Sequence, residues 1–187
     1  ANVNTTTATI VSFPITCNFN IKRGISSAPN SMDIQLINLS KETRDKIFQD
    51  RANFYTDGQG TVVGRQIKLE AGYGDDLYTV FRGNLFEAGS TRRGADIVTY
   101  INARDGGYDT NLTQVFQTYK GTIEYPLSKK SLIEKLIGQF PTLQIGAVTD
   151  DGVTFSRPVV CNGNVYEILK NYAGSKNLFV DLEKVYY

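Results

Sequence analysis

The chain has 187 residues, enough for one or two domains with a sizeable hydrophobic core. Its 20 Lys and Arg residues nearly balance its 19 Asp and Glu residues, so no broad electrostatic attraction to nucleic acid or to a membrane is expected. The sequence contains no histidine, which excludes Ser-His-Asp and Cys-His catalysis and His-ligated zinc.

The cysteines and the hydropathy pattern exclude further classes. Cys17 and Cys161 are the only cysteines, too few for a disulfide framework or a thiolate zinc site. No apolar run approaches the roughly 18 residues of a membrane-spanning helix, and the N-terminus lacks the basic and apolar regions of a signal peptide. We therefore expect a soluble protein that is made in the cytoplasm. Its 11 Tyr and 10 Phe residues, with no Trp, suit a β-rich chain.

The first half of the chain is expected to be rich in strands. Apolar and polar residues alternate over 9–23 and again over 32–39, which is the two-residue period of a half-buried strand. Ser40 is expected to cap a short helix over 41–51. Three more strand-like segments with short polar connections predict an antiparallel meander; they span residues 62–74, 77–90 and 94–106.

The pattern changes near Pro126, where helical periodicity begins. One helix is expected within 128–140, since its apolar residues fall on a single face; these are Leu132, Ile133, Leu136, Ile137 and Phe140. Two strand-like segments, 142–148 and 152–160, are separated by Asp150-Asp151-Gly152, which is typical of a hairpin turn.

A second helix is expected after Asn164, which with Glu167 resembles a capping box. Its buried stripe would consist of Val165, Ile168, Leu169 and Tyr172. Gly174 is a suitable stop for this helix. Residues 177–187 then read as a final strand pair.

The stretch Tyr73-Gly74-Asp75-Asp76 resembles the catalytic hairpin of RNA-dependent RNA polymerases, where adjacent carboxylates hold metal ions. Asp45 and Asp50 match the spacing of an upstream polymerase motif, but they lie in a predicted helix, whereas the polymerase motif ends a strand. A palm with fingers and thumb does not fit in this chain. Gly and Asp are common turn residues, so we interpret the stretch as a hairpin turn.

Other candidate chemical sites have simpler interpretations. Asp150 and Asp151 lack the spaced ligands of an EF-hand loop, which favours a turn over a calcium site. Nothing in the sequence marks a facing pair for glycoside hydrolysis among the remaining carboxylates, and solvated surface charge is the better interpretation; the carboxylates considered are Glu87, Asp96 and Glu124.

Basic and glycine-rich segments give no stronger signal. The segment 104–109, RDGGYD, does not read as a strand leading into a helix with a lysine, as a phosphate loop requires. Arg92 and Arg93, with Arg104, are suited to touch phosphate, but arginines at strand ends more often pair with carboxylates. Cys161 is expected to be a small buried apolar residue.

The order of segments resembles the baseplate or tail hub proteins of contractile and related long-tailed bacteriophages. The resemblance rests on FNIKR…SSAPNSMDIQLINLSKETRDKI, IKLEAGYGDDLYTVFRGNL and STRRGADIVTYINARDGG. It covers roughly residues 10–125 and extends more weakly to the end of the chain.

The resemblance implies a mainly β fold with α+β character. Residues 1–125 would form a tail-tube-like antiparallel β-barrel or sandwich with one flanking helix over 41–51. Residues 126–187 would form a smaller α/β hub domain, and a second tube-like domain would lie beyond Tyr187. No catalytic motif or cofactor belongs to this resemblance, so a non-enzymatic structural protein without cofactor or metal is expected.

The resemblance also implies an assembly. Three copies, or alternatively six, would form a ring in the virion tail baseplate that joins the tail tube to the central spike. Further expected partners are a distal tube protein and the tape measure protein, with DNA passing through the lumen. The hairpin Tyr73, Gly74, Asp75 and Asp76 is the candidate contact between rings or subunits, with a free solvent loop as the alternative.

Three other functions stay open at this point. The chain also suits a tail tube or adaptor protein, or the spike-hub module of a contractile injection system. A glycan-binding or hydrolytic tail module is a further alternative. That module would require an aromatic platform or a close carboxylate pair in a cleft.

Overall fold

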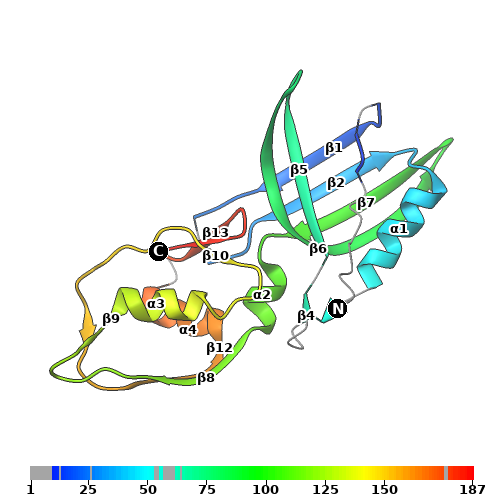
Figure 1. The fold of residues 1–187 in the computed structure, drawn as a ribbon. Helices are drawn as coiled ribbons and strands as arrows, with labels where there is room; N and C mark the ends of the chain where they lie inside the picture. Colours follow the sequence, from blue (N-terminus) through cyan, green and yellow to red (C-terminus); the bar gives the residue numbers. More distant parts are fainter. Residues whose placement is uncertain are drawn as a thin grey trace, which may run out of the picture.

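A computed structural model describes residues 10–12, 14–25, 27–52, 55–56, 62–63, 65–174 and 177–187 of the chain. Figure 1 shows a curled sheet beside α1 (Lys41–Ala52), and a second part built around two helices. The sheet has the strand order β1 (Cys17–Lys22), β2 (Ser31–Ile37), β7 (Asp96–Arg104), β6 (Asp76–Arg93), β5 (Gln66–Tyr73).

All neighbouring strands of this sheet are antiparallel, and β5, β6 and β7 form the predicted meander. The strand predicted over 9–23 is shorter in the structure, because Pro14 lies in a turn and Ile15 donates its N–H to Ser12 instead of a ladder partner. Residues 9 and 13 of that prediction lie outside the described residues. The strand predicted over 62–74 is also shorter in the structure, since β4 (Val62–Val63) pairs separately with β3 (Tyr55–Thr56).

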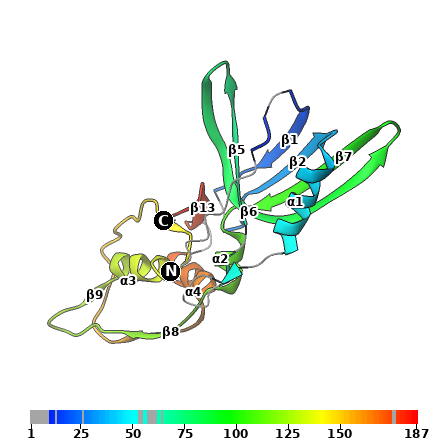
Figure 2. The ribbon, with the colours of Figure 1, turned by 45° about the vertical axis from the view of Figure 1, so that its right-hand side comes forward.

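The sheet curls because β6 is long and carries two bulges. Its first half pairs with β5 and its second half pairs with β7. The register shifts by one residue at Val80, opposite Leu69 and Glu70, and again at Phe86. An extra residue bends a strand and increases its twist, so the two arms of the sheet rise from a common base as a half-barrel (Figure 2).

The inner face of the half-barrel holds the first hydrophobic core. Ser40 caps α1 as predicted, with its Oγ accepting from the N–H of Thr43 at 3.1 Å. Ile47 and Phe48 of α1 pack against this core. The buried core residues are Met32, Ile34, Leu36, Leu39, Phe81, Leu85, Ala88, Ile101 and Ala103.

Gly83 makes the close approach of β6 to the end of β7 possible. A Cβ at this position would lie 2.5 Å from the Arg104 carbonyl oxygen and 2.9 Å from the Asp105 Cα. We expect Gly83→Ala to lower the free energy of unfolding by about 1–3 kcal/mol, because backbone must shift to make room. Gly138→Ala is the control, since its Cβ would meet atoms only at an ordinary 3.5 Å. Equal effects of both substitutions in denaturant unfolding would contradict this account.

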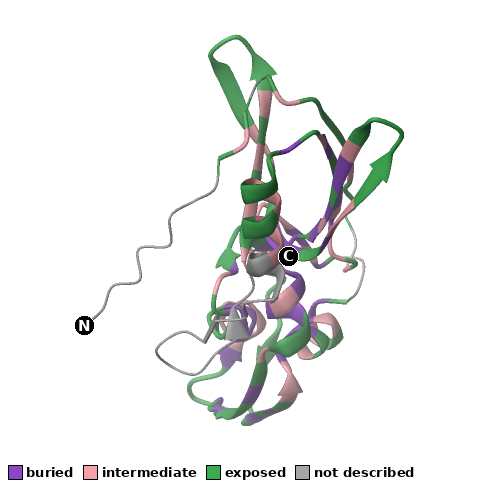
Figure 3. Ribbon diagram, turned by 90° about the vertical axis from the view of Figure 1, so that its right-hand side faces the viewer, coloured by how far each residue is buried: buried purple, intermediate pink, exposed green. Residues whose placement is uncertain are grey.

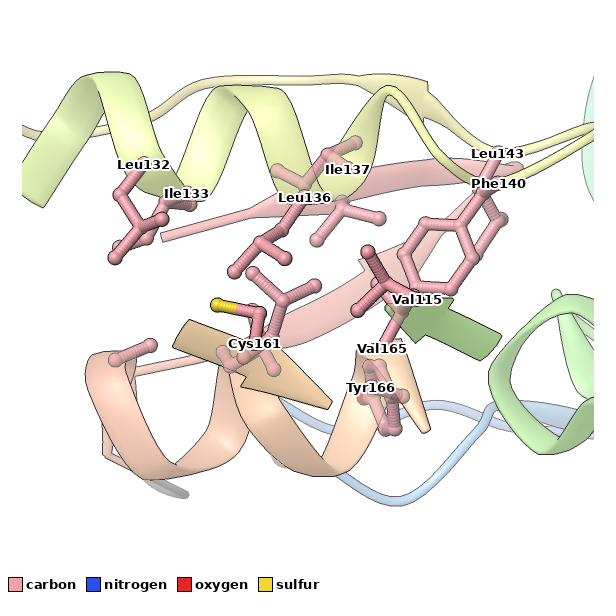
Figure 4. Close-up of a cluster of buried hydrophobic side chains, with 14 of the residues drawn as sticks. Val115, Leu132, Ile133, Leu136, Ile137, Phe140, Leu143, Cys161, Val165 and Tyr166 are labelled. Carbon is pink, nitrogen blue, oxygen red and sulfur yellow. The ribbon is translucent and has the colours of Figure 1, made fainter. Parts of the chain in front are cut away.

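The second part of the chain packs two helices on a two-stranded ribbon. The ribbon pairs β8 (Gln114–Tyr119) with β12 (Val159–Asn164). The helices are α3 (Lys129–Ile137) and α4 (Val165–Ala173). In Figure 4 the side chains of Leu132 and Leu136 point from α3 into the space between α3 and α4, and Leu136 faces Cys161.

This second core is larger than the first. It confirms the predicted stripe of α3, whereas in α4 Ile168 and Tyr172 are only partly buried and Tyr166 and Ala173 are buried instead. Leu132, Ile133, Leu136 and Ile137 are completely buried, as are Val165 and Leu169 of α4. The other buried members are Val115, Tyr119, Leu127, Phe140, Leu143, Val159, Cys161, Tyr166, Ala173, Leu178, Val180 and Val185. Figure 3 shows this burial along the ribbon.

The predicted cap of α4 is confirmed. The Asn164 side chain accepts from the N–H of Glu167 at 3.0 Å, and Gly174 ends the helix at φ 80°. The Glu167 carboxylate instead pairs with Lys170, so the capping box is only half formed within the described residues.

The hairpin predicted around Asp150-Asp151-Gly152 was wrong. The turn exists, because Asp150 and Asp151 accept from the N–H groups two residues on. Its flanking strands pair elsewhere: β10 (Gln144–Ile145) runs parallel to β14 (Lys184–Tyr186), and β11 (Thr154–Phe155) pairs with β9 (Leu127–Ser128). The final strand pair, β13 (Phe179–Asp181) with β14, is confirmed.

A short helix joins the two parts. It is α2 (Gly107–Leu112), which follows β7 directly, so the segment 104–109 does lead from a strand into a helix. The sequence interpretation was wrong on that point, although this helix contains no lysine. The buried Asp109 carboxylate ties α2 to the loop after α3, accepting from the N–H groups of Thr142 at 2.8 Å and Leu143 at 2.9 Å.

Candidate assembly surfaces

The β5–β6 hairpin ends in an exposed turn with acidic side chains. We call Tyr73, Gly74, Asp75 and Asp76 the acidic tip. Gly74 has φ 60°, as the predicted turn requires. Tyr73 is 95% exposed, and Tyr78 beside the tip is 70% exposed. The tip therefore presents aromatic rings and carboxylates to solvent.

The β6–β7 hairpin ends in a turn with the opposite charge. We call Arg92, Arg93, Gly94, Ala95 and Asp96 the basic tip. The Nε of Arg92 donates to the Gly94 carbonyl at 3.1 Å. The Asp96 carboxylate accepts from the Asn38 side chain at 2.8 Å. All five residues are exposed.

The sheet ends in two edge strands, β1 and β5. Within the described residues, β1 pairs only with β2 and β5 pairs only with β6. An edge strand presents unpaired backbone N–H and C=O groups that a neighbouring chain can satisfy. Cys17 is exposed at the start of β1, and Phe19 on the same strand is 48% exposed.

The outer face of the β8–β12 ribbon is a further exposed apolar surface. Phe116 is 76% exposed and Val160 is 70% exposed, whereas Val115 and Cys161 on the other face are buried. The loop after β8 adds Ile123 and Tyr125. Several exposed apolar side chains gathered on one surface are typical of an interaction surface.

A polar junction joins the half-barrel to the β13–β14 hairpin. Asn30 donates to the Val180 carbonyl at 2.9 Å and to Asp181 at 3.1 Å. Asp105 accepts from the N–H of Glu183 at 2.9 Å. Both side chains belong to the half-barrel and are buried, so this junction fixes the turn of the C-terminal hairpin.

The turn held by Asp105 has an uncommon backbone. Leu182 has φ 50° and Glu183 has φ 60°, which are left-handed conformations that non-glycine residues seldom adopt. The N–H groups of consecutive residues in such a turn converge on one point and favour an anion there. Burial nevertheless raises the pKa of Asp105 to about 6, with the hydrogen bonds from Glu183 and Leu182 opposing the rise.

Gln66 and Arg82 of the sheet, together with Arg23 just after β1, complete the junction. Glu183 accepts from Arg82 at 2.9 Å and from Gln66 at 3.0 Å. Arg23 pairs with Asp181 at 3.4 Å and also donates to the carbonyl of Val80, the extra residue of the first bulge. Burial raises the pKa of Glu183, and the Arg82 charge opposes that rise.

The candidate chemical residues of the sequence are not brought together. Among the residues that the structure describes, no group of three or more Cys, Asp or Glu side chains is placed to hold a metal ion. Asp45 lies in α1, away from any strand end, and the side chain of Asp50 lies outside the described residues. Glu87 pairs in register with Asn102, whereas Asp96 is in the basic tip.

Asp151 and Arg104 have structural partners. Asp151 accepts from Lys129 at 2.7 Å and from the Tyr187 hydroxyl at 2.9 Å. The Lys129 hydrogen bond lowers the pKa of Asp151 to about 2. Arg104 lies 3.9 Å over the ring of Phe86, the extra residue of the second bulge. In the described part of the chain, no helix is long and apolar enough to cross a membrane.

Comparison with known proteins assigns the chain to a family. The family described as baseplate hub gp41 matches residues 2–124. The chain belongs to this family. It is accordingly a structural component of a phage tail baseplate, as the sequence resemblance implied. No curated protein matches the chain.

Two solved structures have a fold similar to that of this hub-family chain. The 43 kDa tail protein of prophage MuSo2 from Shewanella oneidensis matches with a TM-score of 0.57 at 13% identity. The match covers 92% of this chain and 50% of the MuSo2 protein. A tail protein from Neisseria meningitidis MC58 matches with a TM-score of 0.54 at 11% identity. This match covers 89% of this chain and 44% of the Neisseria protein. The mainly β fold expected from the resemblance is thus confirmed, and the chain spans about half the length of these solved proteins.

Proposed function

We propose that the chain forms a ring in the baseplate hub that links the tail tube to the central spike. Three copies are favoured, with six as the alternative. The observation that carries this proposal is the open half-barrel, whose two edge strands lie at opposite ends of one sheet. Edge strands of neighbouring copies would pair, and a contact that repeats by rotation closes a ring.

The proposed role is structural and needs no cofactor. The partners would be other copies of the chain, a tail tube or distal tube protein, the spike and the tape measure protein. DNA would pass through the lumen of the ring. The acidic tip is the proposed contact between subunits or rings. Synthesis would take place in the host cytoplasm before assembly into the virion.

The proposed domain division is 1–125 and 126–187. It is supported by two separate clusters of buried residues, one in the half-barrel and one around α3 and α4. The strand β8 precedes residue 126 but contributes Val115 and Tyr119 to the C-terminal cluster.

The exposed Cys17 on the edge strand β1 offers a direct test of ring formation. Light scattering over a concentration series, with and without the tail tube protein of the same phage, should give the mass of a trimer or hexamer. Imaging should reveal a central channel. Labelling of Cys17 by a maleimide should slow at least about tenfold on assembly, because pairing at the β1 edge would cover it.

The buried Cys161 is the internal control, since its labelling should stay slow in both states. A chain that stays monomeric in every mixture, with Cys17 labelled at one constant rate, would contradict the ring. A tail tube protein would stack into repeated rings, whereas the proposed hub should form one. Glycan binding in the absence of rings would favour the glycan-binding alternative.

A further inference from the structure

The acidic tip and the basic tip lie at opposite ends of one strand, β6, and carry opposite charge. Building on the ring assembly proposed above, we propose that the acidic tip of one copy docks on the basic tip of the next copy. The occupant of each tip is thus a second copy of this chain.

The two tips of one molecule point apart. Each of the three ribbon views shows the β5–β6 hairpin and the β6–β7 hairpin as separate arms that diverge from a common base (Figures 1, 2 and 3). The arms diverge because the bulges at Val80 and Phe86 bend β6 between them. Opposite charges on diverging arms cannot neutralise each other within one chain, so they are available between chains.

The acidic tip has no cation of its own. Within the described residues, Asp75 and Asp76 take part in no ion pair. The closest lysine along β5 is Lys68, and it is engaged by Glu70 at 2.9 Å. The two carboxylates of this tip therefore face solvent without a basic partner.

The basic tip is arranged so that its cations remain accessible. Its one carboxylate, Asp96, is held by Asn38, whose side-chain oxygen also accepts from the N–H of Ile97 at 2.9 Å. Arg92 uses its Nε within the turn, which leaves the outer nitrogens of its guanidinium. Arg93 forms no ion pair with any described residue.

The chemistry of the two tips is complementary beyond net charge. A guanidinium can donate two parallel hydrogen bonds to a carboxylate, and it also stacks on an aromatic face. Asp75 and Asp76 offer the carboxylates, and the exposed rings of Tyr73 and Tyr78 offer the faces. Tyr and Arg are also the residues in which protein interfaces are enriched.

The geometry of the contact suits a ring. One copy carries one tip of each kind, so the contact is heterologous and each copy binds two neighbours. Exposed charges are screened by salt and set orientation more than affinity. The tip contact would therefore fix the register in which the edge strands meet, and salt would weaken it.

Charge reversal tests this contact with the whole chain. One variant combines Asp75→Arg with Asp76→Arg, a second combines Arg92→Glu with Arg93→Glu, and a third carries all four substitutions. Arg157→Glu, at an exposed site between β11 and β12, is the control. Circular dichroism checks folding, and sedimentation at low and high salt measures self-association.

Each two-residue reversal should weaken self-association at low salt at least about tenfold, because like charges then meet. The four-residue swap should restore it, since the tips are again complementary. High salt should reduce the differences among the variants, and Arg157→Glu should behave like the wild type.

Rings that form equally well in all variants would overturn the tip contact and leave the ring proposal intact. A wild-type chain that stays monomeric at low salt, both alone and with the tail tube protein, would overturn both. Failure of the four-residue swap to recover, in a folded chain, would also overturn the pairing of these two tips.

Discussion

Replacing Leu136 by Ala should lower the free energy of unfolding by about 2–5 kcal/mol, the range for a fully buried leucine. Leu136 is completely buried on α3 and points toward Cys161 of β12 (Figure 4). The substitution removes apolar contacts and leaves a cavity that rigid neighbours such as Leu132 and Ile137 fill only in part. Chemical denaturation followed by far-UV circular dichroism measures the change.

Two variants serve as controls for this cavity. Leu136→Met keeps most of the volume and should cost less than about 1.5 kcal/mol. Lys135→Ala changes the exposed neighbour on the same helix and should alter the free energy by no more than about 0.5 kcal/mol. A loss below about 1 kcal/mol for Leu136→Ala would contradict the packing of α3 against β12.

Stability should fall by about 2 kcal/mol as the pH rises from 4 to 7, because Asp105 ionises in a buried site. Its pKa is raised from 3.8 to about 6, so the folded chain binds the proton more tightly than the unfolded chain. The added stability is therefore complete below the unfolded pKa and is lost as the pH rises through 6. Glu183, with its pKa also raised, acts in the same direction.

Asp105→Asn should remove most of this pH dependence and still offer an oxygen to the N–H of Glu183. Asp151→Asn is the control, since the pKa of Asp151 is lowered to about 2. The charged Asp151 of the wild type stops stabilising the fold only as the pH falls below about 4 toward 2. The stability of Asp151→Asn between pH 4 and 7 should therefore keep the wild-type slope. Parallel curves for the wild type and Asp105→Asn would contradict the assigned role of Asp105.

Regular elements were predictable because their signals are local. The alternation along β2 and β5 to β7, the turn at Gly74 and the stripes of α3 and α4 all depend on residues close in the sequence. The caps at Ser40 and Asn164 belong to the same class, since the side chain bonds to an N–H three residues on.

The curl and the junction were not predictable, because they depend on contacts between distant residues. A bulge is one extra residue in a ladder, and neither Val80 nor Phe86 breaks the apolar pattern in a way that marks it. The turn at Leu182 and Glu183 lacks glycine, and its partner Asp105 is 78 residues away. The hairpin expected at Asp150–Gly152 failed for the same reason, since β10 finds its partner in β14.

The sequence marks the acidic tip as a candidate contact, but it does not mark the basic tip. In the sequence Arg92 and Arg93 are arginines at a strand end, for which carboxylate partners within the chain are the expected outcome. Their significance depends on the bend of β6, which sets the two tips on separate arms. A sequence pattern gives the charges of each tip but not their directions.

Cryo-electron microscopy of the intact tail would test the central claim most directly. The account predicts one ring of this chain at the distal end of the tail tube, directly above the spike, with β1 and β5 edges of neighbouring copies side by side. Density for the chain repeated along the whole tube, or located only in peripheral fibres, would contradict a hub.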